Sequence, residues 1–357
     1  MKSKKWTKLF LIGVLISVFL CVVAVFIFDP FVQYHKPWFG KVAYDSKYER
    51  YLISGLAKNY DYRSICIGSS MTRRFLISEL EKVMQKPIKF TMSGAIAHEI
   101  NLALNQAIKY NKDIETVLIG FDLFSIKGDK NLIAINFPIN MYNNNLFDYF
   151  LNFYNMKIII SNFTKSISGN NVVFDYEHMF KKAYFDSEQD FNSTKLINKW
   201  YDGKQNKKRI AYFGDGYKFK NINRAKESFQ YNYISLIKNN PQIKFIIFYP
   251  PYSVLVYKDW EYISQLDEVI KSKKYFMQEF EKYKNTEVYD FQDDENITTN
   301  LNLYLDPSHY HQKINTYIAE RIAVRDPRYL VDPATYDERL AHFKKYVSEY
   351  KTKFDEE

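Results

Sequence analysis

An uninterrupted apolar run near the N-terminus constrains this chain more than any other feature of its sequence. The run extends from Leu9 to Phe28 and contains no charged residue. A helix rises about 1.5 Å per residue, so roughly 20 apolar residues match the hydrocarbon core of a membrane, which is about 30 Å thick. Residues 9–28 are therefore expected to form a transmembrane anchor that follows a short cytoplasmic tail, residues 1–8.

The residues that flank this run decide between an anchor and a cleaved signal peptide. The apolar region of a signal peptide is shorter, about 7–15 residues, and ends at small residues. Here the run ends in the bulky segment 26–30, and it is preceded by four lysines: Lys2, Lys4, Lys5 and Lys8. Positively charged flanks stay in the cytoplasm. We therefore expect a single-pass protein of the cell membrane, with a cytoplasmic N-terminus and an extracellular domain after the anchor.

Strand and helix patterns alternate over most of the remaining chain. Short apolar runs typical of buried strands are separated by longer stretches with apolar residues at helical spacing. The expected strands cover residues 64–67, 88–92, 116–121, 244–249 and 287–291, and the expected helices cover residues 73–84, 98–110, 225–238, 259–283 and 309–323. Such alternation favours an α/β fold with a parallel sheet that carries helices on both faces.

Three segments depart from this alternation. Residues 29–60 combine turn formers with aromatic residues and are expected to form a membrane-proximal connector. Residues 130–221 are rich in Asn, Phe and Tyr and are interpreted as a mostly helical insertion, with helices over 146–161 and 177–184. This insertion is either a cap over the site or a surface elaboration. Residues 326–357 are expected to form a C-terminal helical extension.

The composition argues against several classes of protein. The two cysteines, Cys21 and Cys66, lie in the apolar run and in an expected strand, so neither a disulfide framework nor a cysteine metal site is expected. The net charge of +9 comes partly from the lysines before the anchor and is otherwise scattered. It forms no nucleic-acid-binding pattern, so it is interpreted as solvated surface. Because no glycine-rich phosphate-binding motif occurs, no cofactor is expected.

The first candidate for chemistry is the serine pair Ser69-Ser70, which follows the first expected strand across Gly68. Open α/β folds place their sites at the carboxyl ends of parallel strands. A backbone N–H at the start of a helix can also stabilise an oxyanion. Serine is equally a preferred helix N-cap, however, so this segment alone leaves a catalytic and a capping role open.

The second candidate is the loop Asp306-Pro307-Ser308-His309. Asp306 can accept a hydrogen bond from Nδ1 of His309, which leaves Nε2 free to take a proton from a serine hydroxyl. Two other interpretations are that Asp306 or Ser308 caps the following helix, or that Asp306, His309 and His311 bind a metal ion. The metal interpretation lacks a further ligand group, so no metal is expected.

Together, the two motifs resemble those of the SGNH/GDSL hydrolase superfamily over residues 61–325. The resemblance implies a three-layer α/β/α domain around a flavodoxin-like parallel sheet. It also implies that Ser70 is the nucleophile, His309 the base and Asp306 the acid that orients the base. The backbone N–H groups of Ser70 and of Gly94, which follows the second strand, would form the oxyanion hole.

Two positions depart from the pattern of the superfamily. Ser69 stands where the first motif usually has an aspartate, and Asp122 stands where the third usually supplies an asparagine to the oxyanion hole. An ionised Asp122 would repel an oxyanion, so this residue orients the turn around Ser70, is protonated, or marks an inactive member. Another residue would then be the third oxyanion donor, which is unassigned. Ser69, Asp122 and His98, which opens a helix close to Gly94, are candidates for lining the site.

The Gly-Ser-Ser turn, the anchor and the Asp-Pro-Ser-His loop are similar to those of cell-envelope members of the superfamily. Such members transfer D-alanyl groups to teichoic acid or acetylate exopolysaccharides. The similarity implies serine-dependent acyl transfer or ester hydrolysis on a cell-surface polysaccharide or teichoic acid, with a membrane-bound O-acyltransferase as partner. The alternative is a non-catalytic SGNH-like protein that binds polysaccharide or assists assembly of the cell envelope.

Overall fold

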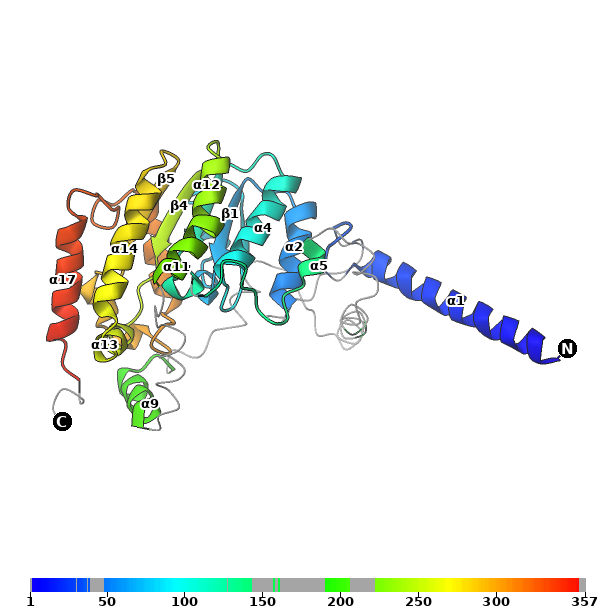
Figure 1. The fold of residues 1–357 in the computed structure, drawn as a ribbon, viewed down its shortest axis with the longest axis horizontal. Coiled ribbons are helices and arrows are strands. Elements are labelled where there is room, and N and C mark those ends of the chain that lie inside the picture. The colour runs from blue at the N-terminus through cyan, green and yellow to red at the C-terminus, as the bar shows by residue number, and fades with distance from the viewer. Residues whose placement is uncertain are drawn as a thin grey trace. The chain divides into compact units, whose positions relative to one another are not determined.

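The chain folds into two compact units, each assembled from separate stretches of sequence (Figure 1). The computed structural model describes residues 2–29, 31–36, 38, 48–126, 128–142, 157, 160, 190–205 and 222–352. The first unit comprises residues 1–61, 106–112 and 135–179, and the second comprises residues 62–105, 113–134 and 180–357. The domain boundaries proposed from the sequence stay a prediction.

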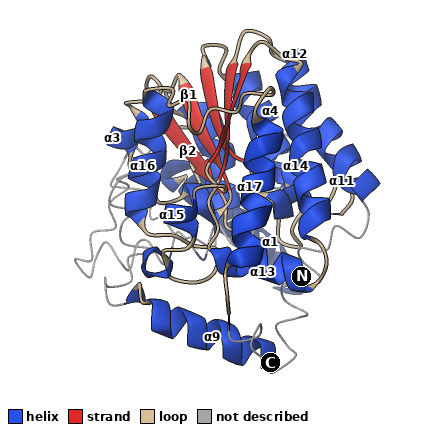
Figure 2. Ribbon diagram, turned by 90° about the vertical axis from the view of Figure 1, so that its left-hand side faces the viewer, coloured by secondary structure: helices blue, strands red, loops and turns tan. Residues whose placement is uncertain are grey.

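A parallel sheet forms the centre of the second unit, which confirms the predicted α/β fold class (Figure 2). In the described part of the chain it has five strands in the order β2-β1-β3-β4-β5. This order is that of flavodoxin-like sheets. The strands are β1 (Ser64–Gly68), β2 (Pro87–Thr91), β3 (Thr116–Gly120), β4 (Lys244–Tyr249) and β5 (Thr286–Asp290).

The strands are nearly continuous apolar runs because helices cover the sheet on both faces. All residues of β1 are buried, and only the first residue of β2, β3 and β4 is partly exposed. One face carries α3 (Ile77–Leu80) and α16 (Gln312–Ala323), which contact each other. The other face carries α11 (Ile222–Phe229), α12 (Ser235–Asn239), α14 (Leu266–Glu281) and the start of α4 (Ala97–Tyr110) (Figure 2).

Aromatic side chains fill the space between the sheet and this second layer of helices. Phe121, directly after β3, lies at the centre of that packing and is fully buried. Its ring centroid lies 5.0–5.8 Å from the centroids of Phe229, Tyr233, Tyr249, Phe276 and Phe280. All five pairs adopt edge-to-face geometry, which the charge distribution of aromatic rings favours.

The first unit contains the apolar N-terminal helix α1 (Lys2–Phe28), with α2 (Glu49–Asn59) and α5 (Ile139–Tyr142). Among the described residues, the segment Lys4–Phe28 is the one helix long and apolar enough to cross a membrane. Helix α2, which has a buried face, lies within the stretch predicted as a membrane-proximal connector. Gly55 allows that face to pack closely, because a Cβ there would overlap the carbonyl oxygens of Phe31 and Val32.

The helix predicted over residues 73–84 is wrong in extent. The chain instead forms the 3₁₀ turn η2 (Ser70–Thr72), then extended residues, and only then the short α3. The buried Lys89 explains the interruption, because its Nζ donates to the carbonyl oxygens of Arg73 and Phe75 at 3.3 and 2.5 Å. These carbonyls therefore bind an ammonium group from β2 rather than helical N–H groups.

Two other predicted helices also differ in detail from the structure. The helix expected over residues 259–283 is two helices, α13 (Val254–Tyr262) and α14, because Ser264 between them adopts a left-handed conformation with φ of 56°. The helix expected over 225–238 contains a π-helical turn, η5 (Gln230–Ile234), between α11 and α12. The remaining strands and helices of the alternating pattern lie where predicted, within a few residues.

The predicted insertion is described only in part. Its helix α9 (Ser193–Gln205) is described, whereas the helices predicted over 146–161 and 177–184 lie outside the described residues apart from positions 157 and 160. Its role as a cap stays a prediction. The short elements η3 (Leu123–Ile126), α15 (Glu295–Thr298) and η6 (Leu301–Leu303) lie between the longer ones.

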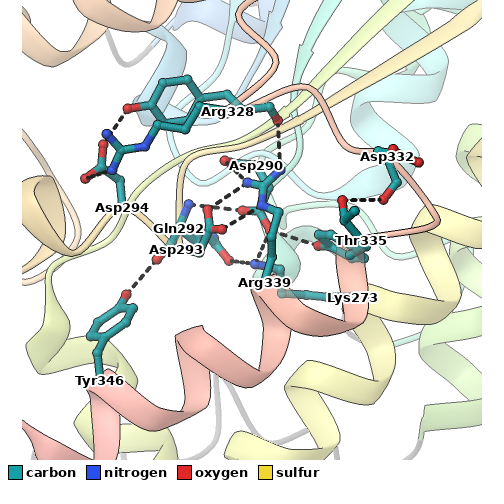
Figure 3. A network of polar contacts seen from close by, with 12 residues as sticks. Lys273, Asp290, Gln292, Asp293, Asp294, Arg328, Asp332, Thr335, Arg339 and Tyr346 are labelled. Carbon is teal, nitrogen blue, oxygen red and sulfur yellow. Dashed lines mark hydrogen bonds and ion pairs between the residues drawn. The ribbon is translucent and has the colours of Figure 1, made fainter.

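A buried network of charges joins the C-terminal helix α17 (Tyr336–Glu349) to the end of β5 (Figure 3). Lys273 of α14 and Asp290 are buried and form an ion pair of 2.7 Å, and Tyr336 donates to the same carboxylate at 2.8 Å. Arg339 binds both carboxylate oxygens of Asp293 at 2.7 and 2.8 Å. Burial would raise the pKa of Asp290, but the cations of Lys273 and Arg339 outweigh it and lower that pKa.

Replacing Lys273 with methionine tests how much this network stabilises the second unit. The side chain keeps its length, but Asp290 loses its buried cation, and breaking a buried pair on one side costs about 3–5 kcal/mol. We expect a loss of that size in urea unfolding of the detergent-solubilised full chain. Lys271→Met on the same helix is the control: its pair with Glu268 is exposed, so the change should stay within about 0.5 kcal/mol. Equal effects of the two substitutions would contradict this account.

Candidate active site

The carboxyl edge of the sheet brings several predicted site residues together. Because the strands are parallel and in register, with Gly68 opposite Thr91, the turns after β1, β2 and β3 leave the sheet at one edge. The chain moves from β1 to one side for β2 and to the other for β3, so the gap between β1 and β3 is a topological switch point. Ser70 and Asp122 follow the two strands that border it, which is where open α/β folds bind ligands.

The turn after β1 presents the predicted nucleophile. Gly68 has a φ of 156°, and a Cβ there would come within 2.8 Å of the Thr72 methyl group and 3.0 Å of the Gly120 carbonyl oxygen. Only glycine fits this crowded turn without strain. Ser69 caps η2 by accepting a hydrogen bond from the backbone N–H of Met71 at 3.2 Å. The capping role therefore belongs to Ser69, and the side chain of Ser70 is left to project from the start of η2.

The loop after η6 holds Asp306 and His309 in one rigid turn. Oδ1 of Asp306 accepts the backbone N–H groups of Ser308 and His309, each at 2.9 Å, while Oδ2 lies 2.7 Å from Nδ1 of His309. The backbone N–H of Leu305 also donates to the carbonyl oxygen of His309 at 2.9 Å. Burial would raise the pKa of Asp306, but the hydrogen bonds and charge of His309 and the N–H of Ser308 lower it to about 2.

The two loops meet at the predicted pair of side chains. Oγ of Ser70 lies 2.8 Å from Nε2 of His309, although the residues are 239 positions apart in the chain. An ionised Asp306 fixes the proton of His309 on Nδ1, so Nε2 accepts the proton of the serine hydroxyl. About a third of each of the side chains of His309 and Asp306 remains exposed. This arrangement can therefore deprotonate a serine that a substrate is able to reach.

The predicted oxyanion donors stand at the same edge. Gly94 is exposed, has a φ of 58° and would leave an added Cβ with no heavy atom within 4 Å. In the described part of the chain, neither its backbone N–H nor that of Ser70 donates a hydrogen bond. The turns that contain them are joined, because the N–H of Met92 donates to the carbonyl oxygen of Gly68 at 3.0 Å. Their role as oxyanion donors stays a prediction.

Asp122 is turned toward Ser69 and a tyrosine. Its buried carboxylate accepts the hydroxyl of Ser69 on Oδ2 and the hydroxyl of Tyr252 on Oδ1, the latter at 2.5 Å. All three side chains are buried, with 1% or less of each residue exposed. Of the roles left open by the sequence, this geometry fits orientation of the turn around Ser70. Both carboxylate oxygens are occupied by donors, so the carboxylate needs no further partner.

Tyr252 is a residue beside the site to which the sequence analysis assigns no role. It follows β4 within Pro250-Pro251-Tyr252, and its position after a strand of the same sheet is the signal that points to it. His98, a candidate for lining the site, instead directs Nδ1 to Oδ1 of Asn232 in η5 at 3.1 Å. Its place in the site stays a prediction. Among the described residues, no group of three or more His, Cys, Asp or Glu side chains could hold a metal ion.

The pH dependence of stability should reveal the buried Asp122. Burial raises its pKa to about 6, against the lowering effects of Ser69, Tyr252 and His309; Tyr233 and Tyr310 also face it. The folded state then binds a proton between about pH 4 and 6 that the unfolded state releases, so stability falls as pH rises through that window.

We therefore expect the free energy of unfolding of the wild type to fall relative to that of Asp122→Asn by roughly 2 kcal/mol between pH 4 and 6, and to stay level above pH 7. Urea unfolding of both proteins across this pH range measures the difference in their free energies of unfolding. The effects of all other titrating groups are the same in both proteins and cancel in this difference. A difference that is constant with pH, or that changes in the opposite direction, would show that Asp122 is ionised without cost.

Comparisons with known proteins add little to this geometry. No family model and no curated protein matches the chain. One solved structure, described as "a putative platelet activating factor from Streptococcus pneumonia", aligns with 80% of this chain and 92% of its own, at 10% sequence identity and a TM-score of 0.37. A likeness of this size shows no family and carries no weight for function, which rests on the contacts of the chain itself.

Proposed function

We propose that this protein is a membrane-anchored serine acyltransferase or esterase that acts on the cell envelope. The observation that carries the proposal is the pair of contacts at His309: 2.8 Å from Nε2 to Ser70 Oγ, and 2.7 Å from Nδ1 to Asp306 Oδ2. A nucleophile, a base and an acid that orients the base are the minimum for covalent acyl transfer through serine. Ser70 and His309 come from loops that are far apart in the sequence, so their contact is not a consequence of being neighbours in the chain.

The reaction begins with attack of Ser70 Oγ on the carbonyl carbon of an acyl donor, while its proton passes to Nε2 of His309. The carboxylate of Asp306 stabilises the imidazolium that forms. The carbonyl oxygen becomes an oxyanion, for which the N–H groups of Ser70 and Gly94 are the donors in this proposal. His309 then returns the proton to the leaving group, the bond from the carbonyl carbon to that group breaks, and an ester on Ser70 remains.

The second half of the reaction decides between transfer and hydrolysis. His309 removes a proton from an acceptor hydroxyl, which attacks the ester on Ser70 and releases the serine. With a sugar or polyol hydroxyl the protein is an acyltransferase, and with water it is an esterase. The part-exposed side chains of His309 and Asp306 suit a large acceptor that approaches from solvent.

The envelope setting of the proposal comes from the N-terminal helix. Residues 4–28 form a helix of the length and composition of a membrane span, and Lys2, Lys4, Lys5 and Lys8 lie at its start. By the positive-inside rule the second unit would lie outside the cell. There it would meet teichoic acid or polysaccharide as acceptor, and a multi-pass O-acyltransferase in the same membrane would supply the acyl group.

Ser70→Ala tests the proposal most simply. Loss of the nucleophile of a triad costs roughly 10³–10⁶-fold in rate, so the purified full chain should lose nearly all hydrolysis of p-nitrophenyl acetate. Cells that produce the variant should also lose esters from their wall polymer. Ser348→Ala, an exposed serine on α17, is the matched control and should behave as the wild type. Retention of both activities by Ser70→Ala would favour the non-catalytic, polysaccharide-binding alternative.

A further inference from the structure

The contacts of Asp122 belong to a larger ring of hydrogen bonds around the candidate site. The first part of this ring joins the turn after β1 to the loop after β4. Asp122 lies between them and accepts one hydroxyl from each, that of Ser69 and that of Tyr252. Since Ser69 directs its proton to this carboxylate, a lone pair remains for the N–H of Met71, which is the bond that begins η2.

The second part of the ring joins the loop after β4 to the loop that carries the base. Ser253, next to Tyr252, donates both its backbone N–H and its hydroxyl to the carbonyl oxygen of Pro307, at 2.9 and 2.8 Å. The hydroxyl of Tyr304 reaches the carbonyl oxygen of Pro251 at 3.3 Å. Pro307 lies between Asp306 and His309, so these bonds fix the position of the imidazole.

The contact between Ser70 and His309 closes the ring. Ser69 and Ser70 are consecutive, and so are Tyr252 and Ser253, so the backbone completes each connection. Every polar link in the ring other than the contact between Ser70 and His309 is buried, where hydrogen bonds are stronger and water does not compete for them. A chain of bonds through the carboxylate of Asp122 therefore contributes to the separation between Ser70 Oγ and His309 Nε2, beside the bonds that Tyr310 and Asn315 donate to the carbonyl oxygen of Met71 at 3.3 and 3.1 Å.

We propose that Asp122 and Tyr252 are positioning residues, which hold the nucleophile turn and the base loop at the separation that proton transfer needs. This inference rests on the proposed function. It also gives a common explanation for the two departures noted in the sequence: Ser69 and Asp122 contact each other, so the serine is the partner that the carboxylate requires.

The ring explains why a charged residue stands at a position where charge is costly. A carboxylate can accept two hydroxyl protons at once, one on each oxygen, and charged acceptors bind more strongly than neutral ones. An amide at position 122 has one oxygen and one NH₂ group, so either Ser69 or Tyr252 would have to reverse its hydroxyl. Reversal at Ser69 would use both lone pairs of its oxygen for the Met71 N–H and the amide, and its own buried proton would lose the acceptor that Asp122 supplies.

The variants Tyr252→Phe and Asp122→Asn test this inference in the detergent-solubilised full chain, with p-nitrophenyl acetate as the probe. A small displacement of reacting groups can cost about 10²-fold in rate, so we expect kcat to fall by about 10–100-fold. KM should change by less than about threefold, because neither side chain would touch the substrate. The double variant should be little worse than Asp122→Asn alone, since both changes break the same ring.

Tyr249→Phe is the matched control. Tyr249 ends β4, three residues before Tyr252, is fully buried, and in the described part of the chain its hydroxyl has no hydrogen-bond partner. Its loss should leave kcat within about twofold of the wild type. Melting temperatures that stay above the assay temperature in every variant separate a positional effect from partial unfolding.

The outcomes distinguish this inference from the proposed function. Wild-type kcat in Tyr252→Phe and Asp122→Asn, or a loss expressed only in KM, would overturn the ring while an inactive Ser70→Ala upheld the serine mechanism. Full additivity of the two substitutions would overturn it as well. An active Ser70→Ala would remove the proposed function and this inference together.

Discussion

The hydrogen bond between Ser70 and His309 depends on the parallel register of the sheet. Ser70 follows the first strand of the sheet and His309 lies beyond the last, so no local interaction brings them together. They meet because every strand ends at the same edge and because the strand order puts β1 near the centre. The topology brings Ser70 and His309 to the same edge. Gly68, the N-cap Ser69 and the turn around Asp306 then set the exact positions of their side chains.

Buried carboxylates at that edge have two separate roles. Asp122 joins the loops on which the candidate site is built, whereas Asp290 and Asp293 join α17 to the end of β5. Burial of charge is costly unless each charge is paired or well hydrogen-bonded. Burial raises the pKa of Asp122, whose partners are two neutral hydroxyls, whereas the cations of Lys273 and Arg339 lower the pKa of Asp290; burial raises the pKa of Asp293 in spite of Arg339.

Features that depend on local sequence could be predicted, and features that depend on distant partners could not. The strands and the Asp306–His309 turn could be predicted because apolar runs and short spacings determine them. The helix over residues 73–84 could not, because Lys89 from the next strand binds its carbonyl oxygens. The contact of Tyr252 could not be predicted for the same reason: its partner Asp122 lies 130 residues away, and nothing in the sequence around either residue indicates the other.

Mapping the covalent adduct of a fluorophosphonate on the full chain in its membrane tests the central claim most directly. Such probes react only with a serine whose hydroxyl is activated by a neighbouring base. If Ser70 and His309 work as a pair, the adduct will lie on Ser70 in peptide mass spectra, and His309→Ala will abolish it. A wild-type protein that takes up no label, or that carries it on Ser69 or on Ser93 next to Gly94 instead, would contradict this account.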